Sequence, residues 1–314
     1  EYPELNLSMA VNGTDTQIDT QVGQKLAELV SEKSGGNITI DVFPNDTLAG
    51  GNATKGIEYV CAGSTDLAAY ATSTLSAIDP LLNIATMPWT FDSYEQAAEV
   101  IATTGGEYYA DELDDKGLTY LGAFHNGFRQ LTNSKHAVTK PDDLKGLKIR
   151  VQQSPTNVEM MRLLGGTATP MGFGDVYTAL QAGILDGAEN NELALTDNGH
   201  GDICKYYSYD MHQMVPDLLV ANYAFLNELS DEERAIFEEG FQIVKHTEQD
   251  AWEDAVAEAK DKAENEQHVN FIYPDTAPFQ EAMAPLHDSV LAANPELQPI
   301  YDLIQQHNAA HTAD

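Results

Sequence analysis

Three short segments of strand type alternate with two segments of helix type within the first 71 residues. The first helix is predicted from Ile18 to the glycines at 35 and 36, because its apolar residues recur at helical spacing. The second runs through Ile57 and ends at Gly63. The predicted strands are residues 5–10, 38–43 and 66–71. This strand–helix order over so short a stretch predicts an open α/β domain with a largely parallel sheet.

A second unit of the same kind follows after residue 116. Its helices are predicted at 154–164, where Ser154 and Pro155 form a helix-start signal, and at 175–181. The predicted strands are residues 118–124, 147–151 and 167–171. The length of 314 residues is also that of about two domains, so we expect an α/β chain with two domains.

The longest periodic stretch covers residues 231–268. Ser230 and Glu233 give it a capping-box start, and no proline interrupts it. An unbroken helix of this length would be about 57 Å long, which exceeds one small domain, so we expect it to span both. The alternative is two helices broken near Gly240.

The charge balance restricts the partners of the chain. It contains 50 acidic and 16 basic residues, a formal net charge of −34. Nucleic acid and anionic membrane surfaces would be repelled, so we expect neither as a partner. An exported protein or one from a high-salt environment fits this charge. The opening Glu1-Tyr2-Pro3 is typical of a mature form whose signal peptide has been removed, although a trimmed chain would look the same.

The scarce basic residues are concentrated in residues 116–150. Seven basic residues against two acidic ones give this window a local charge of +5. Arg129 and Arg150 lie at the edges of predicted strands, and a guanidinium matches a carboxylate through two parallel hydrogen bonds. The window therefore predicts an anion site. The alternative is that both arginines pair with nearby acids on the surface, where such pairs contribute little. The seven residues are Lys116, Arg129, Lys135, Lys140, Lys145, Lys148 and Arg150.

A second candidate segment covers residues 170–191. Asn190 and Asn191 close a strand-like stretch, where an amide can both donate to and accept from a polar ligand. Phe173, between two glycines, is a candidate for stacking on a ligand ring. The simpler alternatives are a turn for Asn190 and a core position for Phe173.

Motifs of catalysis are absent from the sequence. It contains no His-Glu-x-x-His, Gly-x-Ser-x-Gly, Cys-x-x-Cys or phosphate-loop motif. We therefore expect no enzyme, no cofactor and no metal site, with an enzyme acting on sugar acids as the alternative. Cys61 and Cys204 match no metal spacing and form either one disulfide or two separate thiols.

Four stretches carry a resemblance to a known family. They are Asn-Gly-Phe-Arg-Gln at 126–130, Leu-Lys-Gly-Leu-Lys-Ile-Arg-Val at 144–151, Thr-Pro-Met-Gly-Phe-Gly-Asp-Val-Tyr-Thr-Ala-Leu-Gln at 169–181 and Asp-Gly-Ala-Glu-Asn at 186–190. With these motifs the sequence resembles the extracytoplasmic solute-binding proteins of tripartite ATP-independent periplasmic (TRAP) transporters, the DctP-type receptors. The similarity extends over nearly the whole chain.

The resemblance implies a periplasmic-binding-protein-like fold with two α/β domains. A ligand cleft would lie between the domains, and a long helix would span both. The implied first domain comprises residues 1–127 and 216–255, and the second comprises 128–215 and 256–314.

The resemblance also implies the binding residues. Arg150 would form the salt bridge to the ligand carboxylate, Arg129 would assist it, and Asn190 would complete the carboxylate site. The other residues that the resemblance places at the ligand are Gln153, Phe173, Asn126, Tyr70 and Thr72.

The ligand implied by the resemblance is a sugar acid such as a hexuronate, because the Asn190–Asn191 pair is similar to that of hexuronate receptors. Residues 192–195 lack the Trp-Pro of a typical uronate receptor. A C4-dicarboxylate or another organic acid, or a sensory binding module without transport, are the alternatives. As partners we expect the membrane subunits of a TRAP transporter, and we expect a monomer that is periplasmic or lipid-tethered outside the cytoplasmic membrane.

Overall fold

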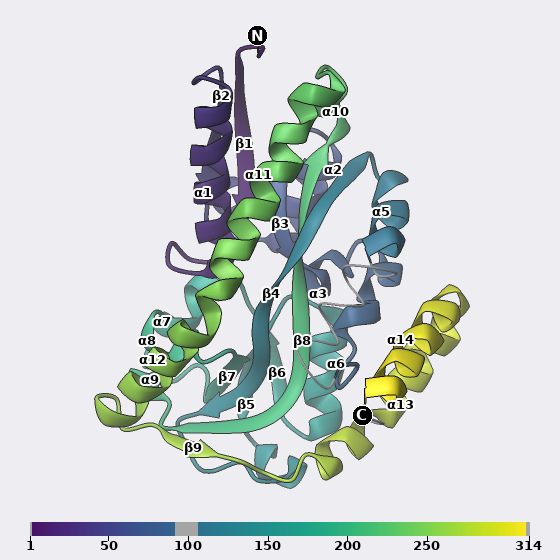
Figure 1. Cartoon of the computed structure of the whole chain (residues 1–314). Helices are drawn as coiled ribbons and strands as arrows, with labels where there is room; N and C mark the ends of the chain where they lie inside the picture. The colour runs from purple at the N-terminus through teal and green to yellow at the C-terminus, as the bar shows by residue number, and fades with distance from the viewer. Residues whose placement is uncertain (1, 92–105, 312–314) are drawn as a thin grey trace.

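The computed structural model describes residues 2–91 and 106–311, and within them nine strands form one mixed sheet flanked by helices (Figure 1). The strand order is β2-β1-β3-β8-β4-β7-β5-β6, and β9 pairs with β8. The strands are β1 (Leu5–Val11), β2 (Ile38–Phe43), β3 (Leu67–Ala71), β4 (Leu118–Asn133), β5 (Lys148–Val151), β6 (Thr167–Pro170), β7 (Gly187–Asn190), β8 (Tyr206–Asn222) and β9 (Asn270–Ile272).

Helices occupy most of the remaining described chain. The α-helices are α1 (Ile18–Lys33), α2 (Ala53–Cys61), α3 (Thr72–Leu75), α5 (Gly106–Asp114), α6 (Pro155–Leu164), α7 (Val176–Gln181), α8 (Leu193–Thr196), α9 (His200–Ile203), α10 (Tyr223–Leu226), α11 (Asp231–Asp250), α12 (Trp252–Asn265), α13 (Ala277–Ala293) and α14 (Gln298–His311). Short 3-10 helices are η1 (Thr47–Ala49), η2 (Pro80–Thr86), η4 (Pro141–Leu144), η5 (Phe173–Asp175) and η6 (Pro295–Leu297).

The first domain is built on β1, which pairs in parallel with β2 on one side and β3 on the other. The strands predicted at 5–10, 38–43 and 66–71 are confirmed as these three. The sheet is covered on both faces. Val22 and Leu26 of α1 are buried in one core cluster, and Ile57 of α2 is buried in another. Because both faces are covered, the parallel strands are apolar over most of their length.

The second domain repeats this scheme with β5 between β6 and β7, again in parallel. The predicted strands at 147–151 and 167–171 and the two predicted helices are confirmed as β5, β6, α6 and α7. Helix α6 begins at Pro155, and the Ser154 hydroxyl caps it by accepting a hydrogen bond from the Asn157 N–H.

Two long antiparallel strands, β4 and β8, run through both domains (Figure 1). Their register extends from Leu118 opposite Asn222 to Asn133 opposite Tyr206. Only the first part of β4, residues 118–124, was predicted as a strand, and β8 was not predicted. Because the sheet is continuous through the molecule, the domain boundaries given above stay a prediction.

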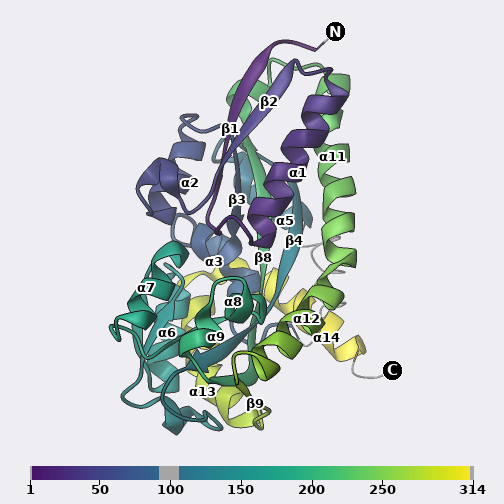
Figure 2. The same cartoon turned by 90° about the vertical axis from the view of Figure 1, so that its left-hand side faces the viewer.

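The predicted long helix spans both domains but is interrupted. It consists of α11, which packs on α1 (Figure 2), and α12, which packs on α8 of the second domain. The two helices meet at Ala251, so the expectation of an unbroken helix is wrong, and so is the alternative break near Gly240. Gly240 lies inside α11, and its missing side chain lets α1 approach closely. A Cβ there would lie only 3.2–3.3 Å from the methyl groups of Leu29 and Leu26.

The two C-terminal helices pack against different cores. Phe279 of α13 is buried in the core beside α6, whereas Ile300 and Ile304 of α14 are buried in the cluster that contains Leu118 of β4. Cys61 and Cys204 are both free, so the disulfide alternative is wrong and the two-thiol interpretation is confirmed.

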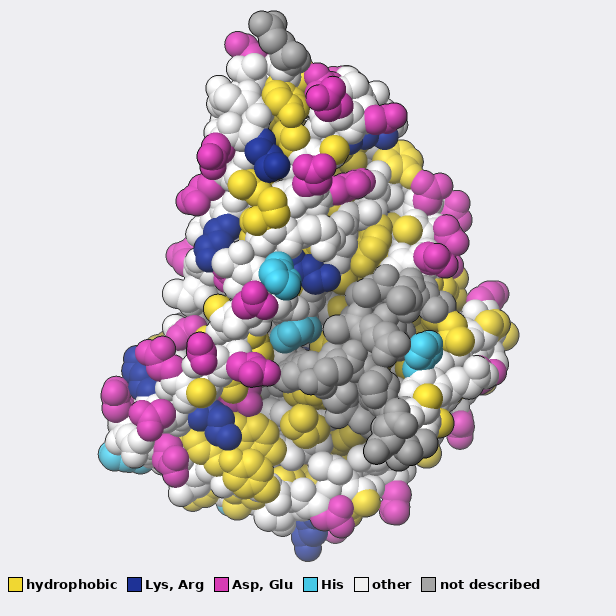
Figure 3. Space-filling view, viewed as in Figure 1, with side chains coloured by type: hydrophobic (Ala, Val, Ile, Leu, Met, Phe, Trp, Pro, Cys, Tyr) yellow, Lys and Arg dark blue, Asp and Glu magenta, His cyan; other side chains and the backbone are white. Residues whose placement is uncertain are grey.

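The surface carries the negative charge that the composition requires. Acidic side chains are scattered over the face seen in Figure 3, with few basic ones among them. Within the described ranges, no helix combines the length and the apolar character needed to cross a membrane.

Candidate functional site

The candidate site is a cleft between the two domains that is lined by twelve residues. From the first domain and β8 these are Asn12, Gly13, Gln17, Asp19, Ala71 and Asp217; from β4 and the second domain they are Asn126, Arg129, Arg150, Gln152, Phe173 and Asn190. The cavity that they enclose measures about 20 Å³, room for about one water molecule. The domains are therefore closed on each other, and a larger solute enters only if they separate.

Arg150 of β5 is a buried cation in this cleft, with 2% of its surface exposed. Its Nε and Nη2 donate to the carbonyl oxygen of Met171 at 2.9 and 2.8 Å, and Nη1 has no partner among the described residues. No ion pair within residues 2–91 and 106–311 includes it. Burial, together with the charge of Arg129, lowers the pKa of Arg150 to about 9. The surface-pairing alternative is therefore wrong for Arg150.

Arg129 of β4 is also buried, but its charge is compensated. Its Nε and Nη2 donate to the Glu189 carboxylate at 2.5 and 3.0 Å, and Nη2 also donates to the Glu189 carbonyl at 2.7 Å. Sequence reasoning missed Glu189 as a site residue. Arg129 and Glu189 are sixty residues apart in the chain, so no local pattern indicates that they pair. The alternative that Arg129 pairs with an acidic residue is therefore correct, but the pair lies in the interior and not on the surface.

A buried histidine extends this ion pair. His212 of β8 lies 3.1 Å from Glu189 Oε2 and 2.8 Å from Asp210 Oδ1 through its two ring nitrogens. Burial alone would lower the pKa of His212, but the two carboxylates outweigh it and raise this pKa to about 9. Burial would raise the pKa of Glu189, whereas Arg129 and His212 lower it to about 2. The four side chains form an alternating buried network that holds Arg129 in place.

The two asparagines at the end of β7, of which Asn190 is the last strand residue, have different roles. Asn190 lies in the cleft, and its Oδ1 accepts a hydrogen bond from the Asn191 N–H at 2.8 Å. The Asn191 amide donates to the backbone and side-chain oxygens of Asn126, at 2.8 and 2.9 Å. Asn191 thus orients Asn126 at the edge of the cleft.

Phe173 fits both sequence-based interpretations. It is 6% exposed and packs in a core cluster, yet it also lines the cleft. Its ring centroid lies 5.4 Å from Arg150 Cζ and 5.5 Å from the His200 ring. The ring therefore supports the guanidinium through a cation–π contact.

The structure does not bring three of the predicted residues to the cleft wall. Gln153 accepts a 3.4 Å hydrogen bond from the Ala53 N–H, and its neighbour Gln152 lines the cleft instead. Tyr70 donates to Asp46 at 2.6 Å within the core, and Thr72 is fully buried. Gln152 directly follows β5, whereas Gln153 lies in the bend before α6, so the two neighbours have different surroundings.

The basic window of the sequence also separates in space. Only Arg129 and Arg150 reach the cleft. Lys116 pairs with Asp79 at 2.7 Å and Lys145 with Asp142 at 2.8 Å, and both pairs lie away from the cleft. Lys135, Lys140 and Lys148 are exposed.

Two buried carboxyl groups on the opposite wall were not predicted. Asp19 accepts hydrogen bonds from the N–H groups of Gly13 and Thr20, at 2.7 and 2.9 Å. Burial raises the pKa of Asp19 to about 6. Burial and then the charge of Asp19 raise the pKa of Asp217 well above its usual range, although Arg129 acts in the opposite direction. An acid-rich sequence gives no local signal for such residues.

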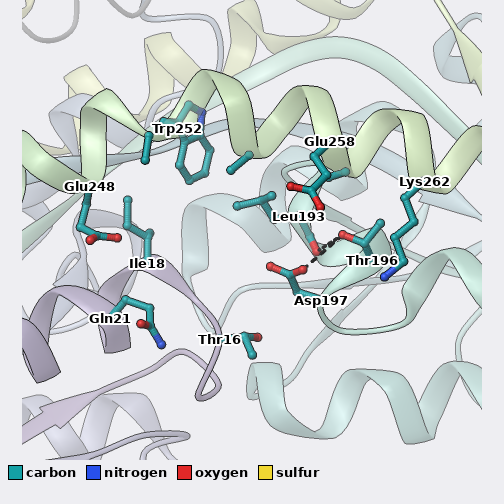
Figure 4. Close-up of a pocket in the computed structure, with 13 residues that line it drawn as sticks. Thr16, Ile18, Gln21, Leu193, Thr196, Asp197, Glu248, Trp252, Glu258 and Lys262 are labelled. Carbon is teal, nitrogen blue, oxygen red and sulfur yellow. Dashed lines mark hydrogen bonds between the residues drawn. The ribbon is translucent and has the colours of Figure 1, made fainter.

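A second hollow lies where α11 meets α12, with a volume of about 310 Å³ (Figure 4). Its walls come from α1, α8, α11 and α12. The Trp252 ring lies across it from Leu193, with Asp197 and Glu258 near Lys262 at its other end. It contains none of the predicted site residues. Within the described residues, no group of three or more His, Cys, Asp or Glu side chains could hold a metal ion.

Comparison with known proteins identifies the family. The model for the bacterial extracellular solute-binding proteins of family 7, DctP, matches residues 7–294. The chain belongs to this family. The resemblance to TRAP receptors and the two-domain α/β fold are thereby confirmed.

Solved structures of this family are similar over almost the whole chain. A TRAP periplasmic solute-binding protein from Anaerococcus prevotii with bound D-glucuronate is 41% identical, with a TM-score of 0.90 and coverage of 97% of this chain and 98% of that one. One from Sulfitobacter with bound β-D-galacturonate is 28% identical, with a TM-score of 0.91 and coverage of 96% and 100%. The 2,3-diketo-L-gulonate-binding periplasmic protein of Escherichia coli is 32% identical over 219 residues, 69% of this chain and 66% of that protein.

Proposed function

We propose that this family 7 protein is an extracytoplasmic receptor that binds a hexuronate and delivers it to a TRAP-type secondary transporter. The observation that carries the proposal is Arg150, a buried cation in the interdomain cleft without an anionic partner among the described residues. The bound D-glucuronate and β-D-galacturonate of two similar receptors support a hexuronate as the solute.

The chemistry follows from the cost of burying charge. A buried cation without a partner is strongly unfavourable, and a solute carboxylate supplies the missing charge. Glu189 already neutralises Arg129, so the solute carboxylate is directed to Arg150, with Asn190 beside it. A neutral sugar leaves Arg150 unpaired and is rejected. Solute binding then favours the closed arrangement of the domains.

The proposed receptor works as a monomer outside the cytoplasmic membrane, either free in a periplasm or tethered by lipid. Its partners are the membrane subunits of the transporter. Family membership supports this placement. We propose binding without catalysis, so the solute should be recovered chemically unchanged after prolonged incubation. Conversion of the solute would instead favour the enzyme alternative. Binding without any interaction with membrane subunits would favour a sensory module.

The test is calorimetric titration of D-glucuronate and D-galacturonate into wild type and Arg150→Ala. Removing one partner of a buried charge pair costs about 2–5 kcal/mol, so we expect affinity to fall by about 30-fold or more. Arg162→Ala is the matched control, because Arg162 pairs with Glu159 on the exposed surface of α6. Undiminished binding by Arg150→Ala, with Arg162→Ala also unchanged, would overturn the assignment of Arg150.

A further inference from the structure

We infer that Asp19 and Asp217 determine specificity: they form a carboxyl end of the cleft that accepts hydrogen bonds from solute hydroxyls and excludes a second solute carboxylate. The solute class is then a polyhydroxylated monocarboxylic acid and not a dicarboxylic acid. This inference rests on the proposed function.

The positions of the two residues support a common role. Asp19 lies in the first turn of α1 and Asp217 lies on β8, where it pairs in register with Ala71 of β3 and Phe124 of β4. Both line the same cavity as Arg129 and Arg150, and each is 4% exposed. The cleft therefore has carboxyl groups on the wall of the first domain and guanidinium groups on the other.

Asp19 is held rigidly in this wall. Both of its carboxylate oxygens accept backbone hydrogen bonds, one from Gly13 and one from Thr20. A side chain at position 13 would collide with it, since a Cβ there would lie 2.1 Å from Asp19 Oδ1. The loop before α1 can therefore close over the carboxylate only with glycine at this position.

Asp217 is available to a solute. Its carboxyl group forms no hydrogen bond and no ion pair within the residues that the structure describes. A buried carboxyl group without hydrogen-bond partners is costly, and a solute hydroxyl that donates to one of its oxygens removes part of that cost. The carboxyl group thus selects for hydroxyl donors in the way that Arg150 selects for a carboxylate.

The charges exclude a second carboxylate at this end. The cations that line the described cleft are Arg129 and Arg150, and Glu189 compensates Arg129, which leaves one unpaired positive charge for one solute carboxylate. A second carboxylate would lie beside Asp19 and Asp217, where the charge of Asp46 already acts on Asp19. Unfavourable placement of like charges is a common source of specificity.

The test compares D-glucuronate with D-glucarate, which carries a second carboxylate in place of the C1 aldehyde. Both are titrated into wild type and Asp217→Asn, with succinate as a C4-dicarboxylate probe. Asp66→Asn is the control, because Asp66 is an acid of the first domain that binds Ser8 outside the cleft. Thermal melts verify folding, and Asp19→Asn provides a second variant if Asp217→Asn does not fold.

We expect wild type to bind D-glucuronate at least 100-fold more tightly than D-glucarate, and Asp217→Asn to reduce this ratio at least tenfold while Asp66→Asn leaves it unchanged. Hexuronate binding with an unchanged ratio in both cleft variants would overturn the inference and leave the proposed function intact. Tight succinate or glucarate binding by wild type would also overturn the inference. Binding of no hexuronate at all would overturn the proposed function itself.

Discussion

The carboxylate of Glu189 binds the guanidinium of Arg129 through two hydrogen bonds, at 2.5 and 3.0 Å, in the interior of the protein. Because of this pair, the two arginines of the cleft have different roles. Arg129 is a compensated, structurally fixed cation, and Arg150, held only by the Met171 carbonyl and the Phe173 ring, keeps its charge for the solute.

Glu189→Gln should destabilise the fold. The substitution keeps the shape of the side chain but leaves Arg129 and His212 without the negative charge between them. Breaking a buried ion pair in this way costs about 3–5 kcal/mol, which urea unfolding would measure. Glu159→Gln, at an exposed ion pair, should change the free energy of unfolding by about 0.5 kcal/mol or less. Equal effects of the two substitutions would contradict the proposed importance of the network.

The stability of the protein should decrease as the pH rises from about 6.5 to above 9. The pKa of His212 is 6.5 in the unfolded chain and about 9 in the fold, so its contribution is complete below pH 6.5 and is lost as the pH passes 9. The shift corresponds to about 3 kcal/mol. Urea unfolding across this range should show a shallower pH dependence for His212→Gln than for wild type.

The matched control for this measurement is His246→Gln. His246 is exposed and forms its pair with Asp250 on the surface. It should retain the pH dependence of the wild type. If His212→Gln retains that dependence as well, the imidazolium is not formed in the fold.

The fluorescence of Trp252 should report domain movement. Trp252 lies directly after the break at Ala251, contacts the His125 ring of β4 and lines the hollow shared with α1 and α8. Separation of the domains changes these surroundings. In Trp89→Phe, where Trp252 is the remaining tryptophan, emission should change with D-glucuronate at the concentrations that calorimetry gives for binding. A fluorescence change that saturates at other D-glucuronate concentrations would contradict this assignment. So would a change seen in Trp252→Phe, which retains Trp89, but not in Trp89→Phe.

Reducing agents should leave thermal stability unchanged, because both cysteines are free. Cys204 is fully buried, and burial raises the pKa of its thiol to about 12, so it should react with a thiol reagent only after unfolding. When the protein is unfolded in denaturant without reductant, a thiol reagent should modify two cysteines per chain. Fewer than two would indicate a disulfide.

The predictability of the fold differed between elements for physical reasons. Strands β1 and β2 were predicted because apolar alternation is a local property of the sequence. Strand β8 was missed because its mixed sequence is stabilised by pairing with β4, almost ninety residues away in the chain. The break at Ala251 was missed because no glycine or proline marks it, and Gly240 was misread because its contact with α1 is tertiary.

The site residues also divide into those that local sequence indicates and those that only tertiary contacts reveal. Arg150 and Phe173 stood out through residue type and motif, and the structure places both in the cleft. Gln153 was selected one position away from the lining residue Gln152, since the sequence does not indicate which of two neighbours faces inward. Glu189, Asp19 and Asp217 became visible only through burial and long-range contacts, which a chain with 50 acidic residues conceals.

The most direct test of the central claim is a crystal structure of the protein with D-glucuronate. We expect the solute carboxylate within hydrogen-bond distance of the Arg150 guanidinium, with the hydroxyl-bearing end of the ring directed to Asp217. A structure in which the carboxylate binds elsewhere and Arg150 remains without an anionic partner would contradict the account.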